Sequence, residues 1–395
     1  MFRRIIIGIF IFIILLPLIM YLAWVFMPKT KLNVLILDKT VLTTKIQEHI
    51  SLSWVLSHEK YVHSDSGVYK PKLHYKGFFP DDKGNYSIND YNDYSRDELL
   101  KLASNNDMLY YTDLFGIYSN EWIATYYPER VEDPRFISER SKLYYGGLSK
   151  KELELLSIFK QQKKLIINEF NIIAHPTAHH IRRTYEEEFG IRWSGWVGRY
   201  FDSLDTLTNM DIPRWLINNY LDQHNGKWPF TKSGIAFVRE DDKVEILENK
   251  THLDIEVPII YTDKAIAKRF NVRKKMKYPF WFDIISVTDT TNKVLSEYKI
   301  GANLVGDTLL RHWNIPNKFP AMVANQNGLY YYLAGDFCDN PIGLGSAKFR
   351  GIHWFTFITA TNEKAERVSF FWRYYRPFLM KVLDDYSEKL NNDKN

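Results

Sequence analysis

The chain begins with an apolar run that limits what its N-terminus can form. Residues 5–27 contain no charged side chain. As a helix that rises ~1.5 Å per residue, the run would extend roughly 34 Å and cover the ~30 Å hydrocarbon core of a bilayer. A cleavable signal peptide would have a shorter apolar core followed by a small-x-small site, which the exit Trp24-Val-Phe-Met-Pro28 lacks. The run therefore predicts an uncleaved transmembrane anchor.

The charges beside the apolar run favour one orientation. Arg3, Arg4 and the amino terminus precede the run, whereas Lys29 and Lys31 follow it, which gives a slight positive bias on the N-terminal side. This bias places residues 1–4 in the cytoplasm and the globular part outside it. An alternative keeps the globular part in the cytoplasm. Because the first expected strand starts at Leu32, the folded part should lie close to the bilayer, and membrane lipid is its first expected partner.

The composition is that of a folded globular chain. Hydrophobic residues make up 45% and charged residues 25%, which is typical of a packed globular protein. Basic and acidic residues are interspersed, so the sequence predicts no nucleic-acid surface. Cys338 is the single cysteine, which excludes an intrachain disulfide and a cysteine zinc cluster.

Short apolar strands alternate with helices in the first half of the chain. Strands are expected at 32–38, 107–113 and 165–171, and helices at 46–59, 97–105, 149–162, 176–189 and 212–224. Ser149 and Glu152 form a capping box for one of these helices. The segments 60–95 and 114–147 are expected to be rich in loops. This alternation predicts an α/β fold with a mostly parallel sheet flanked by helices and interrupted by inserted loops.

The second half of the chain is less regular. A hairpin is expected at 235–248, strands at 280–287, 294–300 and 354–361, a helix at 306–313, and a second hairpin at 320–334 around an Asn-Gly turn. An amphipathic helix should follow, with a break at Arg376-Pro377. We therefore expect an α/β core over 31–250, a β-rich continuation over 251–362 that returns to the core sheet, and a C-terminal helix and tail over 363–395.

Three of the expected strands end in acidic residues, namely Asp38, Asp113 and Glu169. Ligands of open parallel sheets bind beyond the carboxyl ends of the strands. Converging carboxylates raise one another's pKa and can divide acid and base roles. We predict Asp113 and Glu169 as acid and base of a carboxylate-lined cleft, with Asp38 as a third catalytic group. The same acids could hold a hard cation, or each could only cap the segment that follows it.

Five further residues are candidates for ligand binding. Asn171 follows the third strand, and Asp336 follows the strand expected at 329–334. Arg182 lies in an expected helix and could hold an anion. Trp196 and Arg199 belong to the unusual segment 193–201, where aromatic side chains and two glycines could form a stacking subsite.

The histidines at 175, 179 and 180 do not have the spacing of a zinc site. The first precedes the expected helix, and no glutamate lies between them as in the zinc-protease pattern. We therefore predict no metal ligands and no cofactor.

The strands 32–38, 107–113 and 165–171, together with residues 320–336, resemble the core of class I glutamine-amidotransferase-like proteins, including their trehalose-utilisation-like branch. The resemblance covers about 32–250 and 320–340 and implies a flavodoxin-like fold. The family carries a nucleophilic cysteine after the strand that matches 165–171. Here Glu169-Phe-Asn171 occupies that place, so glutamine hydrolysis is not expected.

The sequence thus supports one main functional hypothesis and one alternative. The first is a membrane-anchored extracytoplasmic protein that binds or hydrolyses glycan-type ligands of the cell envelope, as a hydrolase if it is an enzyme. The second is a non-catalytic binding or scaffold module that works with other proteins of envelope polysaccharide assembly.

Overall fold

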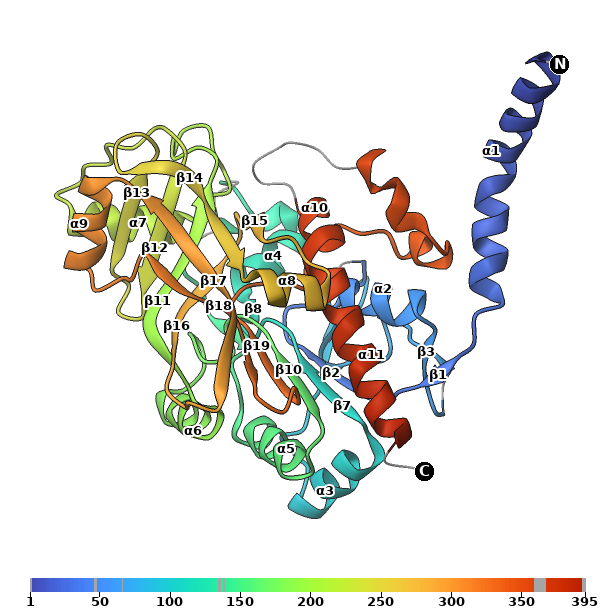
Figure 1. Cartoon of the computed structure of the whole chain (residues 1–395). Coiled ribbons are helices and arrows are strands. Elements are labelled where there is room, and N and C mark those ends of the chain that lie inside the picture. The colour runs from blue at the N-terminus through green and yellow to red at the C-terminus, as the bar shows by residue number, and fades with distance from the viewer. Residues whose placement is uncertain are drawn as a thin grey trace.

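A ten-stranded sheet runs through the body of the molecule (Figure 1). The computed structural model describes residues 2–45, 48–65, 67–133, 136–137, 139–358 and 367–392. In spatial order the strands are β15 (Lys275–Lys277), β14 (Leu253–Thr262), β17 (Asn292–Ala302), β18 (Lys318–Asn325), β19 (Tyr330–Leu333), β10 (Leu165–Asn168), β7 (Met108–Tyr111), β2 (Val34–Asp38), β5 (Lys76–Pro80) and β6 (Tyr86–Asn89).

The large sheet is mixed, and only its centre is parallel. The strands β19, β10, β7, β2 and β5 pair in parallel. All other pairings in this sheet are antiparallel. The prediction of a mostly parallel sheet therefore describes the centre alone. β5 and β6, and likewise β18 and β19, follow one another through the short connections 81–85 and 326–329, which are too short for a parallel crossover, so these pairs are antiparallel.

A second, antiparallel sheet packs on the antiparallel half of the first. Its order is β13 (Val244–Glu248), β12 (Gly234–Arg239), β11 (Ile191–Phe201) and β16 (Phe282–Val287). The ring of Phe282 lies 5.1 Å from that of Tyr298 and 5.6 Å from that of Phe319. A Cβ on Gly198 would come within 2.4 Å of the Phe282 ring, so glycine permits this close packing. Two small sheets pair β1 (Thr30–Lys31), β3 (Tyr61–His63) and β4 (Gly67–Val68), and β8 (Ile117–Tyr118) with β9 (Leu143–Tyr145).

Helices cover both faces of the parallel centre. Tyr110 and Tyr111 are neighbours in β7, so their side chains point to opposite faces. The Tyr111 hydroxyl donates to the Glu152 carbonyl in α5 at 3.2 Å, whereas the Tyr110 hydroxyl lies 2.8 Å from that of Tyr375 near the C-terminus. The helices are α1 (Phe2–Val25), α2 (Ile50–His58), α3 (Arg96–Asn105), α4 (Ser119–Tyr126), α5 (Lys150–Gln161), α6 (His179–Phe189), α7 (Arg214–Gln223), α8 (Lys264–Phe270), α9 (Leu304–His312), α10 (Val368–Phe370) and α11 (Arg376–Asn392), with the 3-10 turns η1 (Pro128–Arg130), η3 (Leu344–Lys348) and η4 (Ile352–Ile358) and the π-helical turn η5 (Phe371–Tyr375).

Most of the expected elements are confirmed, and the exceptions are local. The capping box of Ser149 and Glu152 is formed, and Gly190 ends α6 with a φ of 66°. The strand expected at 354–361 is wrong over 354–358, which belong to η4, and 359–361 lie outside the described residues. α4 lies in a region expected to be loop, and β14, α8 and β15 were not expected.

The N-terminal apolar run forms α1, which projects from the body (Figure 1). Its C-terminal end is docked, because the Trp24 indole donates to the Ser57 carbonyl at 3.1 Å. The side chains of residues 2–5 and 8–9 lie outside those described. Within the part of the chain that is described, no helix reaches the length and apolarity needed to cross a membrane. The transmembrane anchor therefore stays a prediction.

Candidate functional site

The predicted acidic residues share one edge of the sheet. Asp38 ends β2, Asp113 follows β7, Glu169 follows β10 and Asp336 follows β19. The four strands are parallel neighbours, so their carboxyl ends meet at this edge. The negative charge of Asp336 contributes to raising the pKa of Asp113 and of Glu169, which indicates that the carboxyl groups lie near one another.

Four half-buried carboxyl groups form what we call the acidic centre: Glu48, Asp113, Asp336 and Asp339. Burial, followed by the charges of Asp339 and Asp336, raises the pKa of Glu48 well above its usual range. Burial and Asp336 also raise the pKa of Asp339 to about 6. Such groups hold protons more tightly than free carboxyls do, as proton donors near neutral pH must.

Arg367 bridges two acids of this centre. Its guanidinium lies 2.8 Å from Asp336 Oδ2 and 2.5 Å from Asp339 Oδ2, and it stacks 4.0 Å from the centre of the Phe280 ring. One oxygen each from Glu48, Asp336 and Asp339 lie within 4.8 Å of one another, so the three could hold a hard cation. Arg367 already supplies positive charge to two of them, and a cation would have to compete with it.

Asp113 is held at the centre by its own loop. Its Oδ1 accepts from the Phe115 N–H at 2.6 Å. Burial, followed by the charge of Asp336, raises the pKa of Asp113 well above its usual range, while hydrogen bonds from Phe115 and from the Asn171 side chain oppose this. Asn171 has a φ of 66°, and its N–H donates to Asp283 at 3.0 Å. The structure thus brings together the predicted Asp113, Asn171 and Asp336.

Glu169 and Asp38 lie behind the acidic centre and are fully buried. Glu169 accepts one hydrogen bond from the Tyr110 hydroxyl and another, at 3.0 Å, from the Cys338 N–H. Burial raises the pKa of Glu169 well above its usual range. Both of its oxygens therefore hold neighbouring protein groups, one of which lies in the loop that carries Asp336 and Asp339.

Asp38 has a comparable place beside Glu48. Its Oδ2 lies 2.6 Å from His49 Nδ1, and its Oδ1 accepts from the N–H and the hydroxyl of Thr40 at 3.0 and 2.9 Å. The other His49 nitrogen lies 2.9 Å from the Pro71 carbonyl oxygen. Asp38 thereby fixes the segment before α2 that carries Glu48.

Arg199 is a half-buried cation near the acidic centre. Among the described residues no carboxylate is within ion-pair distance of it, and its guanidinium lies 4.7 Å from the Phe201 ring and 5.7 Å from the Trp281 ring. Burial lowers the pKa of Arg199, and the charges of Arg367 and Asp336 also act on it. A ligand at the acidic centre could therefore meet Arg199 and the half-buried Trp281.

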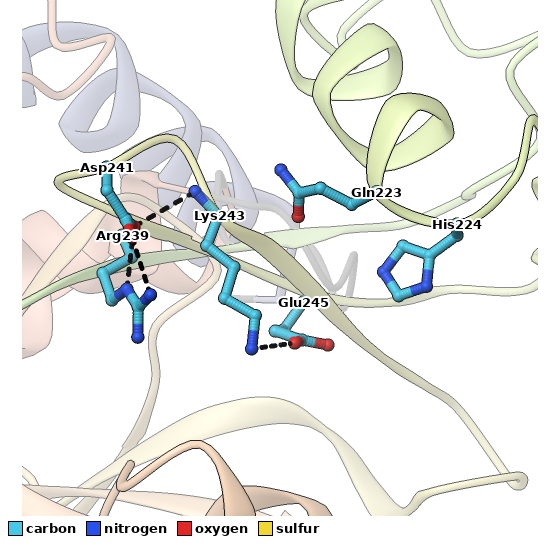
Figure 2. A pocket seen from close by; sticks show the side chains of 6 residues that line it. All are labelled: Gln223, His224, Arg239, Asp241, Lys243 and Glu245. Carbon is cyan, nitrogen blue, oxygen red and sulfur yellow. Dashed lines mark hydrogen bonds and ion pairs between the residues drawn. The ribbon is translucent and has the colours of Figure 1, made fainter.

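The predicted Arg182 and Trp196 lie elsewhere. Arg182 pairs with Glu240 at 2.7 Å and stacks over Trp193 at 5.0 Å, while Arg239 stacks over Trp196 at 5.3 Å. Figure 2 shows a pocket near Arg239 that is lined by the end of α7 and by the β12–β13 hairpin. Its charged side chains pair with one another, Arg239 with Asp241 at 2.6 Å and Lys243 with Glu245 at 2.7 Å. Because these charged side chains already pair with one another, fewer of them are available to a ligand here than at the acidic centre.

Four residues of the site were missed by the sequence analysis: Glu48, Trp281, Asp339 and Arg367. Asp339 is only three positions from the predicted Asp336, so its place in the same loop was a usable signal. Arg367 lies 28 positions further along the chain, and only the fold joins it to Asp339.

Comparisons with known proteins identify no family. No protein-family model matches the chain, and no curated protein matches it. Among solved structures, a crystal structure of a ThuA-like protein from Bacteroides uniformis covers 86% of this chain and 96% of its own, at 9% identity and a TM-score of 0.33. At this identity and TM-score the likeness is distant.

Proposed function

We propose that the protein is a membrane-anchored α/β protein that binds or hydrolyses glycan-type ligands of the cell envelope at the acidic centre. The observation that carries the proposal is the convergence of Asp113, of Glu48, and of Asp336 and Asp339 in one loop, from three separate segments beside two arginines. Carboxylates and guanidinium groups are suited to the many hydroxyl groups of a sugar, since they accept and donate paired hydrogen bonds. Trp281 adds an aromatic face for stacking.

The hydrolytic form of the proposal assigns different roles to the carboxyl groups. We assign Asp113 as the proton donor, because burial and the charge of Asp336 raise its pKa and so favour its protonated form. Asp336, paired with Arg367 at 2.8 Å, is the carboxylate that acts as base or stabilises positive charge. Glu169 and Asp38 position the loops that carry these groups rather than meeting the ligand.

The membrane part of the proposal rests on α1. Its described side chains are unusually exposed for apolar residues; Phe10, Ile13 and Ile14 are 64%, 59% and 59% exposed. An exposed apolar surface of this kind marks contact with a membrane or another protein. The slight positive bias of Arg3, Arg4 and the amino terminus over Lys29 and Lys31 favours a cytoplasmic N-terminus and an extracytoplasmic body. Protease treatment of intact and permeabilised cells tests this orientation, since only an external body is cut in intact cells.

The test of the site uses Asp113→Asn and Glu48→Gln, with Glu187→Gln on the outer face of α6 as a control. Soluble peptidoglycan fragments and neutral oligosaccharides are supplied, and both binding heat and release of reducing ends are measured. For an enzyme, Asp113→Asn should lower the rate of release by about 100-fold or more while binding changes little. Wild-type protein that neither binds nor cleaves any of these ligands would contradict the proposal.

The alternative is a non-catalytic binding or scaffold module in envelope polysaccharide assembly. The Arg367 bridge favours it, because a guanidinium that neutralises Asp336 and Asp339 suits a fixed recognition surface as well as it suits catalysis. If the wild-type protein binds a glycan without releasing reducing ends, and Arg367→Gln binds it more weakly, the result supports this alternative.

A further inference from the structure

The segment η3–η4, residues 344–358, lies against the C-terminal half of α1. The Arg350 N–H donates to the Met20 carbonyl at 3.0 Å, and the rings of Phe349 and Tyr21 lie 6.3 Å apart. Figure 1 shows this segment standing beside α1, away from the sheet. Met20 precedes the end of the apolar run at residue 27 by seven residues, which corresponds to about 10 Å along a helix. With α1 in a bilayer, η3–η4 would therefore lie at the depth that interfacial segments occupy.

The exposed side chains of this region suit a lipid headgroup layer. Trp354 is 74% exposed and Phe26, at the end of α1, is 82% exposed. Tryptophan prefers the membrane interface, where its ring meets both apolar and polar groups. Lys348 and Arg350 are exposed beside these rings, so the surface combines aromatic and positive groups, as surfaces that bind anionic lipid do.

Arg376 adds a buried cation that lacks an anion. It is 6% exposed, its Nε has no hydrogen-bond partner, and no carboxylate of the described chain is within ion-pair distance. Its guanidinium lies 5.7 Å from the Trp54 ring and 5.8 Å from the Trp372 ring, and its NH2 faces His353 Nδ1 at 3.5 Å. Burial lowers the pKa of Arg376 to about 10. A buried charge without a partner is costly, so this cation favours an external anion.

The other charged groups around Arg376 do not neutralise its charge. Arg350 pairs with Glu59 at 2.9 Å and remains 42% exposed. Burial lowers the pKa of His58 to about 3, so this histidine is neutral at physiological pH. The two positive charges of Arg350 and Arg376 are thus only partly balanced by the one negative charge of Glu59, so this cluster keeps a net positive charge.

We propose that η3–η4 lies in the membrane interface and that Arg350, His353 and Arg376 bind the phosphate of a phospholipid headgroup. The inference rests on the membrane anchor of the proposed function and goes beyond it, because it names a lipid site on the globular body. It involves none of the residues of the acidic centre.

The position of the segment is tested by fluorescence in nanodiscs with the full chain. Trp354→Cys is labelled with an environment-sensitive fluorophore; Cys338 is fully buried, and unlabelled wild-type protein confirms that it does not react. Ile14→Cys reports on α1. Leu207→Cys reports on a loop, at a residue that is 87% exposed. Spin labels near the headgroup should quench the probe at 354 several-fold more than that at 207, while spin labels deep in the acyl chains should quench the probe at 14.

The two ideas fail separately in this experiment. Quenching at 14 without quenching at 354 overturns the lipid contact of η3–η4 and leaves the anchor standing. Absence of quenching at 14 overturns the anchor itself, and with it the inference.

The ligand is tested by thermal unfolding of the full chain in an uncharged, phosphate-free detergent. Short-chain phosphatidylglycerol should raise the unfolding midpoint, whereas diacylglycerol of equal chain length should not. Arg350→Gln, at an exposed position, should weaken this effect about tenfold or more, and Arg376→Gln at least as much. The control Arg311→Gln lies on the exposed face of α9 and should behave as wild type. Equal effects of both lipids, a wild-type response of Arg350→Gln, or equal stabilisation by inorganic phosphate would overturn the lipid site.

Discussion

Glu169 shows how a single buried carboxyl group can shape a site without meeting its ligand. Its two oxygens accept hydrogen bonds from Tyr110 and from the Cys338 N–H, and Tyr375 completes this network through the Tyr110 hydroxyl and the Cys338 sulfur. Position 338 lies between Asp336 and Asp339. The hydrogen bond to Cys338 therefore fixes the loop from which two acids of the centre project.

We predict that Glu169→Gln and Glu169→Ala differ sharply. Glutamine can keep one acceptor for the Cys338 N–H, so the free energy of unfolding should change by about 1 kcal/mol or less. Alanine leaves two buried donors without an acceptor and should cost roughly 2–5 kcal/mol. Denaturant unfolding measures both. A wild-type stability of Glu169→Gln combined with a 100-fold loss of turnover would instead make Glu169 the acid or base of the reaction.

Asp283 should give the protein a specific pH dependence of stability. It is fully buried, accepts from Asn171 and Tyr332 at 3.0 and 2.6 Å, and burial raises its pKa from 3.8 to about 6. Because the folded state holds the proton more tightly, this stabilisation is complete below about pH 4 and is lost as the pH rises through 6. The loss is about 3 kcal/mol for a shift of this size.

Asp283→Asn removes that titration while keeping an oxygen acceptor at the site. The free energy of unfolding of the variant, measured between pH 4 and 7, should therefore fall less steeply than that of wild-type protein. Asp241 is a matched control, since its pKa is lowered to about 2 by Arg239 and it titrates below this window. A steep slope that persists in Asp283→Asn but changes in Asp241→Asn would contradict the assignment.

At the scale of elements, α3 and α5 offer the same capping box in two environments. Glu98 accepts from the Ser95 N–H at 2.7 Å on the surface, and Glu152 accepts from the Ser149 N–H at 2.7 Å in the interior. Glu152 additionally pairs with the buried Lys39 at 2.8 Å. The start of α5 is thereby tied to the end of β2, next to Asp38.

The two boxes separate capping from the buried ion pair. Glu98→Gln should cost about 0.5 kcal/mol or less of unfolding free energy, because the amide oxygen of glutamine can still accept from the Ser95 N–H. Glu152→Gln should cost roughly 3–5 kcal/mol, because it also leaves Lys39 as a buried charge without a partner. Adding Lys39→Met to Glu152→Gln should recover part of the loss in denaturant unfolding. Equal losses of unfolding free energy in Glu98→Gln and Glu152→Gln would mean that the Lys39–Glu152 ion pair does not stabilise the fold.

The break expected at Arg376-Pro377 has a clear structural outcome. Pro377 has no N–H to donate to the Arg373 carbonyl, and the helix enters α11 through the π-helical turn η5. The Arg273 N–H accordingly donates to the Arg373 carbonyl at 3.2 Å, which joins the C-terminal helix to the segment between α8 and β15. The sequence predicted the break because proline acts locally. It could not predict Arg273 as the donor, because that contact depends on the tertiary fold.

The same distinction between local patterns and tertiary contacts applies to the whole molecule. The strand ends at Asp38, Asp113 and Asp336 were predictable, because apolar runs bounded by acids are local patterns and parallel strands bring their ends to one edge. The antiparallel pairing of β14, β17 and β18 was not predictable, because the alternation of side chains along a strand does not indicate its direction relative to its neighbours. Glu48 and Arg367 complete the acidic centre through contacts between distant segments, for which the sequence carries no periodic signal.

The attachment of α1 to the body decides whether the two move as one unit. The Trp24 indole donates to the Ser57 carbonyl at 3.1 Å, and the Lys60 ammonium lies 3.7 Å from the Trp24 ring and 3.4 Å from the Val25 carbonyl. These contacts hold the end of α1 against α2, so the short connection to β1 should be protected from proteases.

Trp24→Ala removes both the indole donor and the ring that Lys60 faces. Losing a hydrogen bond and a cation–π contact of about 1 kcal/mol each should increase local opening roughly tenfold. Trypsin cleavage after Lys29 and Lys31, measured on the full chain in nanodiscs, should accelerate by that factor, while the unfolding midpoint of the body stays unchanged. Leu18→Ala is the control, because Leu18 is 53% exposed on α1 and lies before the docked turn. If Trp24→Ala is cut no faster than Leu18→Ala, α1 is held against the body by contacts other than those of the Trp24 side chain, such as the hydrogen bond from the Arg350 N–H to the Met20 carbonyl.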